Sequence, residues 1–83
     1  MDNEALLIKL KKTLRITGEY QDDTLVELIQ QVKFDMVGMG VSQEVVDSAE
    51  SVGTIIKGVW DRDNLHEYSP DFEKQVIRLR ERR

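Results

Sequence analysis

Apolar side chains recur every three or four residues in four separate segments of this chain, and this spacing constrains the fold more than any other feature. Such spacing places the apolar side chains on one face of an α-helix, whereas a half-buried β-strand requires alternation at every second residue. No segment of the sequence alternates in that way. The pattern therefore predicts an all-α fold, a single small bundle of about four helices.

Capping residues and helix breakers set the expected helix boundaries. Asp22 or Asp23 can cap a helix, and Gly38-Met39-Gly40 can end it. Ser42 and the pair Ser69-Pro70 mark two further helix starts. The predicted helices run over roughly 3–14, 23–37, 43–60 and 70–81.

The four apolar stripes predict the core. They consist of Leu7, Leu10 and Leu14; Leu25, Leu28, Ile29, Val32 and Met36; Val45, Ala49, Val52, Ile56 and Val59; and Phe72, Val76 and Leu79. Trp60, the only tryptophan, widens the third stripe; it could belong to the core or to an interface, and we expect the core. Gly53 and Gly58 each cost about 1 kcal/mol relative to alanine inside a helix, so either another helix approaches closely at these positions or the helix bends, and we favour the close approach.

Length and composition limit the class of protein. A chain of 83 residues fits one domain, spanning 1–83, and its composition is that of a folded globular protein. The sequence contains no cysteine, so no disulfide can stabilise the fold. The longest apolar run, Ala5 to Ile8, is far too short for a signal peptide or a membrane span, which predicts that the chain stays in the cytoplasm.

The net charge of −4 is unevenly distributed. Residues 22–73 contain twelve acidic and three basic side chains, whereas residues 74–83 contain five basic and one acidic. The chain therefore has an acidic body and a basic C-terminal tip at 74–83.

The residues that enzymes need are nearly absent. His66 is the only histidine, and without cysteine or a second histidine a transition-metal site is not expected. Asp61-Arg62-Asp63 begins like a calcium loop, but the positions that should follow are occupied by unsuitable residues. The four serines have no candidate base nearby in the sequence. We expect no enzymatic activity, no metal and no cofactor.

One segment suggests an alternative function. Gly40-Val41-Ser42-Gln43 between two predicted helices looks like the turn of a helix-turn-helix protein, which would make the segment near 40–52 a DNA-binding element of a regulatory protein. Its helix carries Glu44, Asp47 and Glu50 and no basic residue before Lys57, and acidic side chains repel the phosphate backbone. This charge makes DNA binding the weaker hypothesis.

The basic tip has two interpretations. Cations near a helix C-terminus offset the helix dipole, which is a purely structural role. Alternatively, an arginine-rich tip binds carboxylates or phosphates of a partner through bidentate contacts. The second interpretation gives the candidate docking residues, which are Lys74, Arg78, Arg80, Arg82 and Arg83.

Short motifs follow one another along nearly the whole chain. They are Lys12-Thr13-Leu14-Arg15-Ile16, Asp22-Asp23 before Leu25-Val26-Glu27-Leu28-Ile29, Val59-Trp60-Asp61, and Ser69-Pro70-Asp71-Phe72 before Ile77-Arg78-Leu79-Arg80. In this order they resemble the head-to-tail connector (adaptor) proteins of long-tailed bacteriophages and prophages. The resemblance lies in the order and spacing of the motifs.

The resemblance implies a structural protein rather than an enzyme. Such a helical adaptor assembles as a homo-oligomeric ring beneath the portal protein, extends the DNA channel, and presents a surface to the tail-completion protein. DNA then passes through the channel without sequence-specific binding, and the basic C-terminal segment contacts the portal. The protein would occur in the host cytoplasm during assembly and at the head-tail junction of the virion. A helical domain that binds one host partner is a third possibility.

Overall fold

The computed structural model describes residues 2–19 and 21–81 and is entirely helical in its regular structure within those ranges. Its helices are α1 (Asn3–Leu14), α2 (Asp22–Gly38), α3 (Gln43–Val46), the 3₁₀ turn η1 (Ala49–Ser51), α4 (Val52–Asn64) and α5 (Pro70–Arg80). The predicted all-α fold is confirmed.

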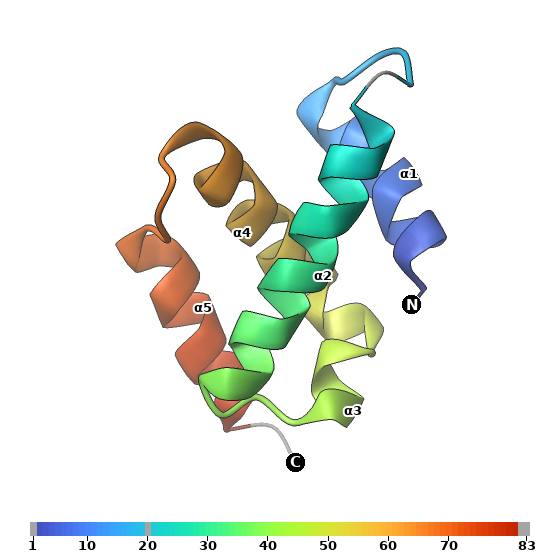
Figure 1. The fold of residues 1–83 in the computed structure, drawn as a ribbon. Helices are drawn as coiled ribbons and strands as arrows, with labels where there is room; N and C mark the ends of the chain where they lie inside the picture. Colours follow the sequence, from blue (N-terminus) through green and yellow to red (C-terminus); the bar gives the residue numbers. More distant parts are fainter. Residues whose placement is uncertain (1, 20, 82–83) are drawn as a thin grey trace.

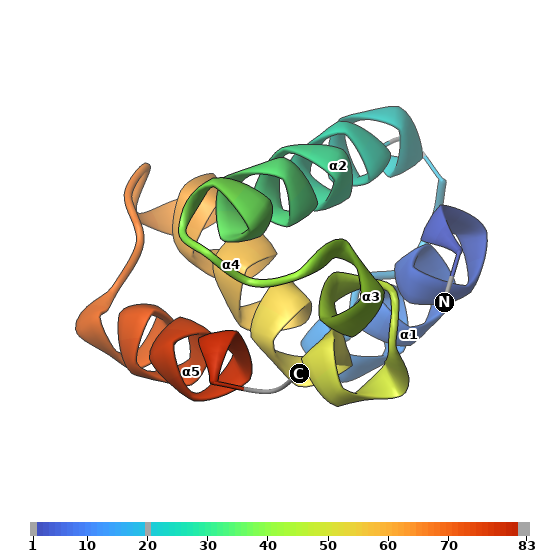
Figure 2. The same ribbon diagram turned by 90° about the horizontal axis from the view of Figure 1, so that it is seen from below.

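The helices pack around α2 and α4, which lie against each other in the middle of the molecule (Figure 1). Helix α1 covers one side of α2, and α5 packs against α4 (Figure 2). The apolar stripes meet between these helices to form one core. Its largest fully buried side chains are Phe72, Leu6, Leu10, Leu25, Ile29, Met36 and Ile55.

Helix starts follow two of the predicted caps. Ser42 Oγ accepts a hydrogen bond from Val45 N, and Ser69 Oγ accepts one from Phe72 N, each at 3.3 Å. Pro70 occupies the first helical position of α5, as predicted.

The predicted cap of α2 is wrong. Asp22 and Asp23 lie inside the first turn, and Gln21 at the N-cap position makes no side-chain capping bond. Asp22 instead forms an ion pair with Lys11 of α1, with Nζ 2.7 Å from Oδ1. Because Asp22 pairs with a residue of another helix, its carboxylate does not cap α2.

The predicted stop after α2 is confirmed in detail. Helix α2 ends at Gly38, and Gly40 has a left-handed φ of 104°. Val41 N donates to Met36 O and Gly40 N donates to Val37 O, each at 3.0 Å, which is a Schellman motif. The chain therefore turns sharply before α3.

The prediction of one continuous helix over 43–60 is wrong, because the structure divides this range into α3, η1 and α4. The chain leaves the helical conformation at Ser48, which is extended, and resumes it in η1 and α4. Ser48 Oγ donates to Val45 O at 2.7 Å, and Ser51 Oγ donates to Val46 O at 2.5 Å. Val45 O also accepts a hydrogen bond from Ser48 N at 3.0 Å. The hydroxyls of both serines therefore bond carbonyls in the last turn of α3 and stabilise the break. As a consequence Ala49 is exposed.

The two glycines of α4 differ. A Cβ added to Gly58 would lie 2.6 Å from Cε1 of Phe72 and 2.8 Å from Cγ1 of Val32, so the predicted close approach is confirmed there. A Cβ at Gly53 would meet nothing within 4 Å, and the prediction for that position is wrong. Gly58 thus marks where α2, α4 and α5 converge.

Trp60 is not part of the core, contrary to the prediction. It is 38% exposed on the outer side of α4, with Lys57 Nζ 4.7 Å from the centre of its ring. Most of the circumference of α4 is buried against other elements, and Trp60 falls on the remaining strip together with Gly53 and Asn64.

Candidate functional site

The five predicted docking residues do not lie on one surface. Lys74 and Arg78 lie one turn apart on the same flank of α5, whereas Arg80 lies on the other flank. Arg82 and Arg83 lie outside the described residues. The basic tip is therefore not one continuous patch over its described part.

The flank with Lys74 and Arg78 borders an open groove between α4 and α5. Its lining residues are Lys57, Asp71, Lys74, Gln75 and Arg78. Gln75 Oε1 accepts a hydrogen bond from Thr54 Oγ1 at 2.9 Å, which links α5 to α4 beside the groove. The groove is thus lined by three cations and one carboxylate.

The three cations are not equally available to a partner. Lys57 Nζ lies 3.1 Å from Asp61 Oδ1 and is already paired. Lys74 and Arg78 are exposed, and neither forms an ion pair or side-chain hydrogen bond within residues 2–19 and 21–81. These two side chains can bind carboxylate or phosphate groups of a second molecule without giving up an internal partner.

Arg80 has a different environment. The aliphatic part of its side chain covers Gly40, where an added Cβ would lie 2.6 Å from Arg80 Cδ. The residue therefore packs on the turn after α2, a contact that depends on its methylene groups rather than on its charge. We assign it mainly to the fold.

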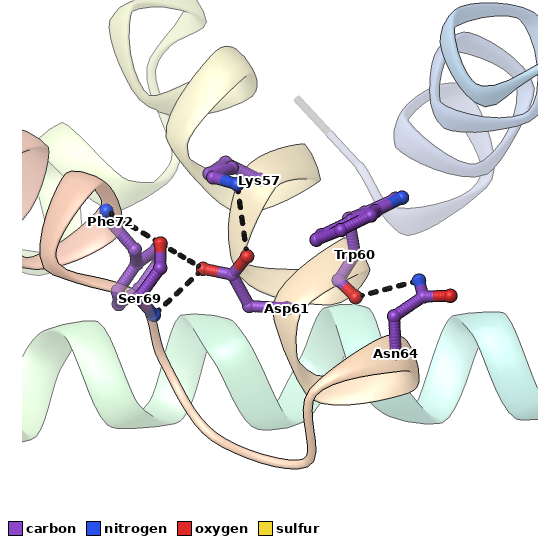
Figure 3. Close-up of polar contacts among 6 residues, drawn as sticks. All are labelled: Lys57, Trp60, Asp61, Asn64, Ser69 and Phe72. Carbon is purple, nitrogen blue, oxygen red and sulfur yellow. Dashed lines mark hydrogen bonds and ion pairs between the residues drawn. The ribbon is translucent and has the colours of Figure 1, made fainter.

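Asp61 fixes the position of α5 against α4. Its side chain is completely buried, and Oδ2 accepts hydrogen bonds from Ser69 N at 3.0 Å and Ser69 Oγ at 2.7 Å (Figure 3). Burial alone raises the pKa of Asp61, but the bonds from Ser69 and the charge of Lys57 outweigh it, and the pKa is lowered. Because Ser69 also caps α5, this carboxylate orients the helix that carries Lys74 and Arg78.

Tyr68 makes a second connection at the same end of α5. Its hydroxyl donates to Asp35 Oδ2 of α2, and its ring stacks on Phe72 with 4.2 Å between centroids. Arg62 of α4 lies over the same ring, with Cζ 5.5 Å from its centre. Burial, and then the bond to Asp35, raise the pKa of Tyr68.

Several large apolar side chains are exposed on the surface. Those with the largest exposed fractions are Phe34 at 76% and Ile8 at 65%. The other exposed large apolar residues in the described part of the chain are Leu65, Ile77, Val37 and Trp60.

Sequence reasoning missed Lys57 and Asp61 as parts of this region. Lys57 and Asp61 are four residues apart, which is the spacing of a helical ion pair, and this signal was available in the sequence. Their relation to Ser69 and to the groove depends on how α4 and α5 pack, which local patterns do not reveal.

No metal site is formed by the described part of the chain, where no three histidine, cysteine or acidic side chains gather. Asp61 and Asp63 fall within α4 rather than in a loop. His66 lies exposed in the connection to α5, with a left-handed φ of 61°. Within the described ranges, no helix is both long enough and apolar enough to span a membrane.

Comparison of the chain with protein-family models, with curated proteins and with solved structures finds no match. The resemblance to phage connectors therefore rests on the motifs of the sequence itself.

Proposed function

We propose that this chain is a head-to-tail connector of a phage or prophage particle. It assembles as a ring on the portal protein, extends the DNA channel, and presents its other side to the tail-completion protein. In this proposal the protein is structural and not an enzyme, works in the host cytoplasm during assembly, and remains at the head-tail junction of the virion.

The observation that carries the proposal is the cationic flank of α5. Lys74 and Arg78 are exposed, lack internal partners within the described residues, and border a groove beside which Thr54 and Gln75 link α4 to α5. Such a flank suits an acidic surface of another protein. The resemblance to connectors, in which the C-terminal segment contacts the portal, identifies that protein as the portal.

The DNA-binding alternative loses support from the helix boundaries. A recognition helix must be long enough to lie in the major groove, but α3 comprises four residues and ends before Ser48. Its exposed Glu44 and Asp47 would face the phosphates. A domain that binds one host partner would use the same α5 flank, and attachment to heads separates it from the connector.

The test is attachment to heads. Heads that lack tails, taken from the phage or prophage that encodes the chain, are mixed with the purified protein and sedimented. We expect the protein to sediment with heads that contain the portal and not with heads assembled without it. The double variant Lys74→Gln, Arg78→Gln should lose this attachment, because charge-assisted contacts are removed from every subunit at once.

Arg80→Gln is the matched control, because it removes one positive charge from the same helix on the other flank. It should sediment with heads like the unmodified protein. A third variant, Arg82→Gln, Arg83→Gln, measures the contribution of the remaining two predicted docking residues. Unchanged attachment of the Lys74 and Arg78 variant would exclude the flank as the docking site, and no attachment of the unmodified protein would refute the connector function.

A further inference from the structure

The outer face of α1 combines an exposed apolar residue with cations. Ile8 is 65% exposed and, together with Ala5, Lys9 and Lys12, lines a surface hollow. Lys9 and Lys12 are exposed and make no ion pair within residues 2–19 and 21–81. Arg15, also exposed, follows the end of the helix. Glu4, one turn before Ile8 on the same side, is also exposed, so the face turns from acidic through apolar to basic along the chain.

The outer face of α2 has the complementary composition. Phe34 is 76% exposed and lies on the side of the helix opposite the buried stripe that contains Ile29 and Val32. Glu27 and Asp23 precede it on the same side by seven and eleven residues. Both carboxylates are exposed and unpaired within the described part of the chain. This face runs from acidic to apolar along the chain.

The order of these groups selects one orientation. If Ile8 contacts Phe34 with the two helices antiparallel, Glu27 lies about 10.5 Å from that contact along α2. Lys12 lies about 6 Å from the contact along α1, on the side toward Glu27, and Arg15 follows at the C-cap of α1. A parallel arrangement would instead place Lys12 beside Gly38, where α2 ends and its outer face carries no acid.

We propose that the α1 face of one copy of this chain binds, antiparallel, to the α2 face of a second copy. The two faces are different surfaces, so the contact is heterologous and leaves one face of each kind free for the next copy. The charge complementarity of the two faces supports the contact itself. That the contacts close into a ring rests on the proposed connector function. None of its residues belongs to the α5 flank that is proposed to bind the portal.

Disulfide cross-linking tests the register, because the chain has no cysteine of its own. In the proposed register Ala5 faces Val37, three residues beyond the contact on each helix. An Ala5→Cys chain and a differently tagged Val37→Cys chain are mixed at high concentration and oxidised. The matched control is Gln30→Cys in place of Val37→Cys. Gln30 lies on the same face of α2 but about 10.5 Å from Val37 along the helix, which is too far from Ala5 for a disulfide in this register. We expect the mixed dimer to form about tenfold faster with Val37→Cys than with the control.

Two outcomes would overturn the proposal. Equal rates for Val37→Cys and Gln30→Cys would exclude the antiparallel register. Self-dimerisation of the Ala5→Cys chain as fast as mixed dimer formation would mean that like faces pair, so that the contact is isologous. Far-UV circular dichroism verifies that each exposed-site variant keeps its helices.

A charge exchange tests the cause of the orientation. Lys12→Glu in the Ala5→Cys chain, or Glu27→Lys in the Val37→Cys chain, should each slow the mixed cross-link roughly two- to fivefold, as expected for an exposed ion pair. Combining the two variants should restore the rate. Failure of the combination to restore it would show that these charges do not meet. These measurements use the purified chain without heads, so their failure leaves the portal-binding test unaffected.

Discussion

The two ends of α5 are built differently. At its N-terminal end, Ser69 is bonded to buried Asp61, and Tyr68 connects to Asp35. At its C-terminal end, Leu79 packs into the core but the neighbouring Arg78 projects without a described partner. The first end therefore holds the helix in place, and the second leaves charged groups available for binding. Substitutions at the N-terminal end of α5 should therefore change the free energy of unfolding, and substitutions at its C-terminal end should change attachment to heads.

The largest effect is expected for Phe72→Ala. Phe72 is completely buried where α2, α4 and α5 converge, and its removal leaves a cavity beside Gly58. We expect a loss of about 3–5 kcal/mol in the free energy of unfolding, which is a large part of the total for a chain of this size. Urea denaturation followed by circular dichroism measures it. Ile77→Ala on the same helix, at a 46% exposed position, is the control and should change stability by less than about 1 kcal/mol.

The next largest effect concerns Asp61→Asn. An amide removes the charge that pairs with Lys57 and cannot accept both bonds from Ser69 equally well. A loss of about 1–3 kcal/mol is expected, which is below the range of roughly 3–5 kcal/mol for a fully buried pair because Lys57 is partly exposed. A variant as stable as the unmodified chain would mean that α5 is held by apolar packing alone.

Asp61 also predicts a pH dependence. Its pKa is lowered in the folded protein relative to the ordinary value of 3.8, so the unfolded chain binds this proton more tightly. The stability that Asp61 contributes is therefore present above that value and is lost as the pH falls through the lowered pKa. Thermal melts between neutral pH and pH 2 should decline less for Asp61→Asn than for the unmodified chain.

A smaller effect is expected for Tyr68→Phe, which keeps the stacked ring but removes the bond to Asp35. The loss should be about 1–2 kcal/mol. Because the pKa of Tyr68 is raised above its ordinary value of 10.0, the folded protein holds this proton more tightly than the unfolded chain. Stability should therefore fall above pH 10 in the unmodified chain, and that fall should be reduced in the variant. Parallel alkaline denaturation curves would contradict this role.

Much of the fold followed from local patterns, and the exceptions have physical causes. The boundaries of α1, α2 and α5 agree closely with the predictions because apolar spacing, Ser69-Pro70 and Gly40 all act locally. The break at Ser48 was missed because the apolar stripe continues in register across it, while the serine hydroxyls that stabilise it compete with the helix through side-chain bonds. The exposure of Trp60 depends on which part of α4 the other helices leave uncovered.

The candidate site was predictable only in part. Lys74 and Arg78 were identified as candidates from charge, and helical geometry alone separates Arg78 from Arg80, since residues two apart point to nearly opposite sides. The contribution of Lys57 to the groove, and the packing of Arg80 on Gly40, required the tertiary structure. Charge along the sequence thus identified the helix but not which of its flanks is free.

The smallest effect on stability is expected for the variant Lys74→Gln, Arg78→Gln. Glutamine has nearly the helix propensity of lysine and arginine, and neither side chain gives up an ion pair within the described residues. What is lost is the interaction of Arg78 with the helix dipole, about 0.5 kcal/mol, so the melting temperature should move by only a few degrees. Attachment to heads should nevertheless be lost, and attachment of the unmodified chain should weaken as salt increases, because exposed charges are screened. A loss of stability as large as that of Asp61→Asn would show that this flank holds the fold together, and the contrast between the two ends of α5 would then be wrong.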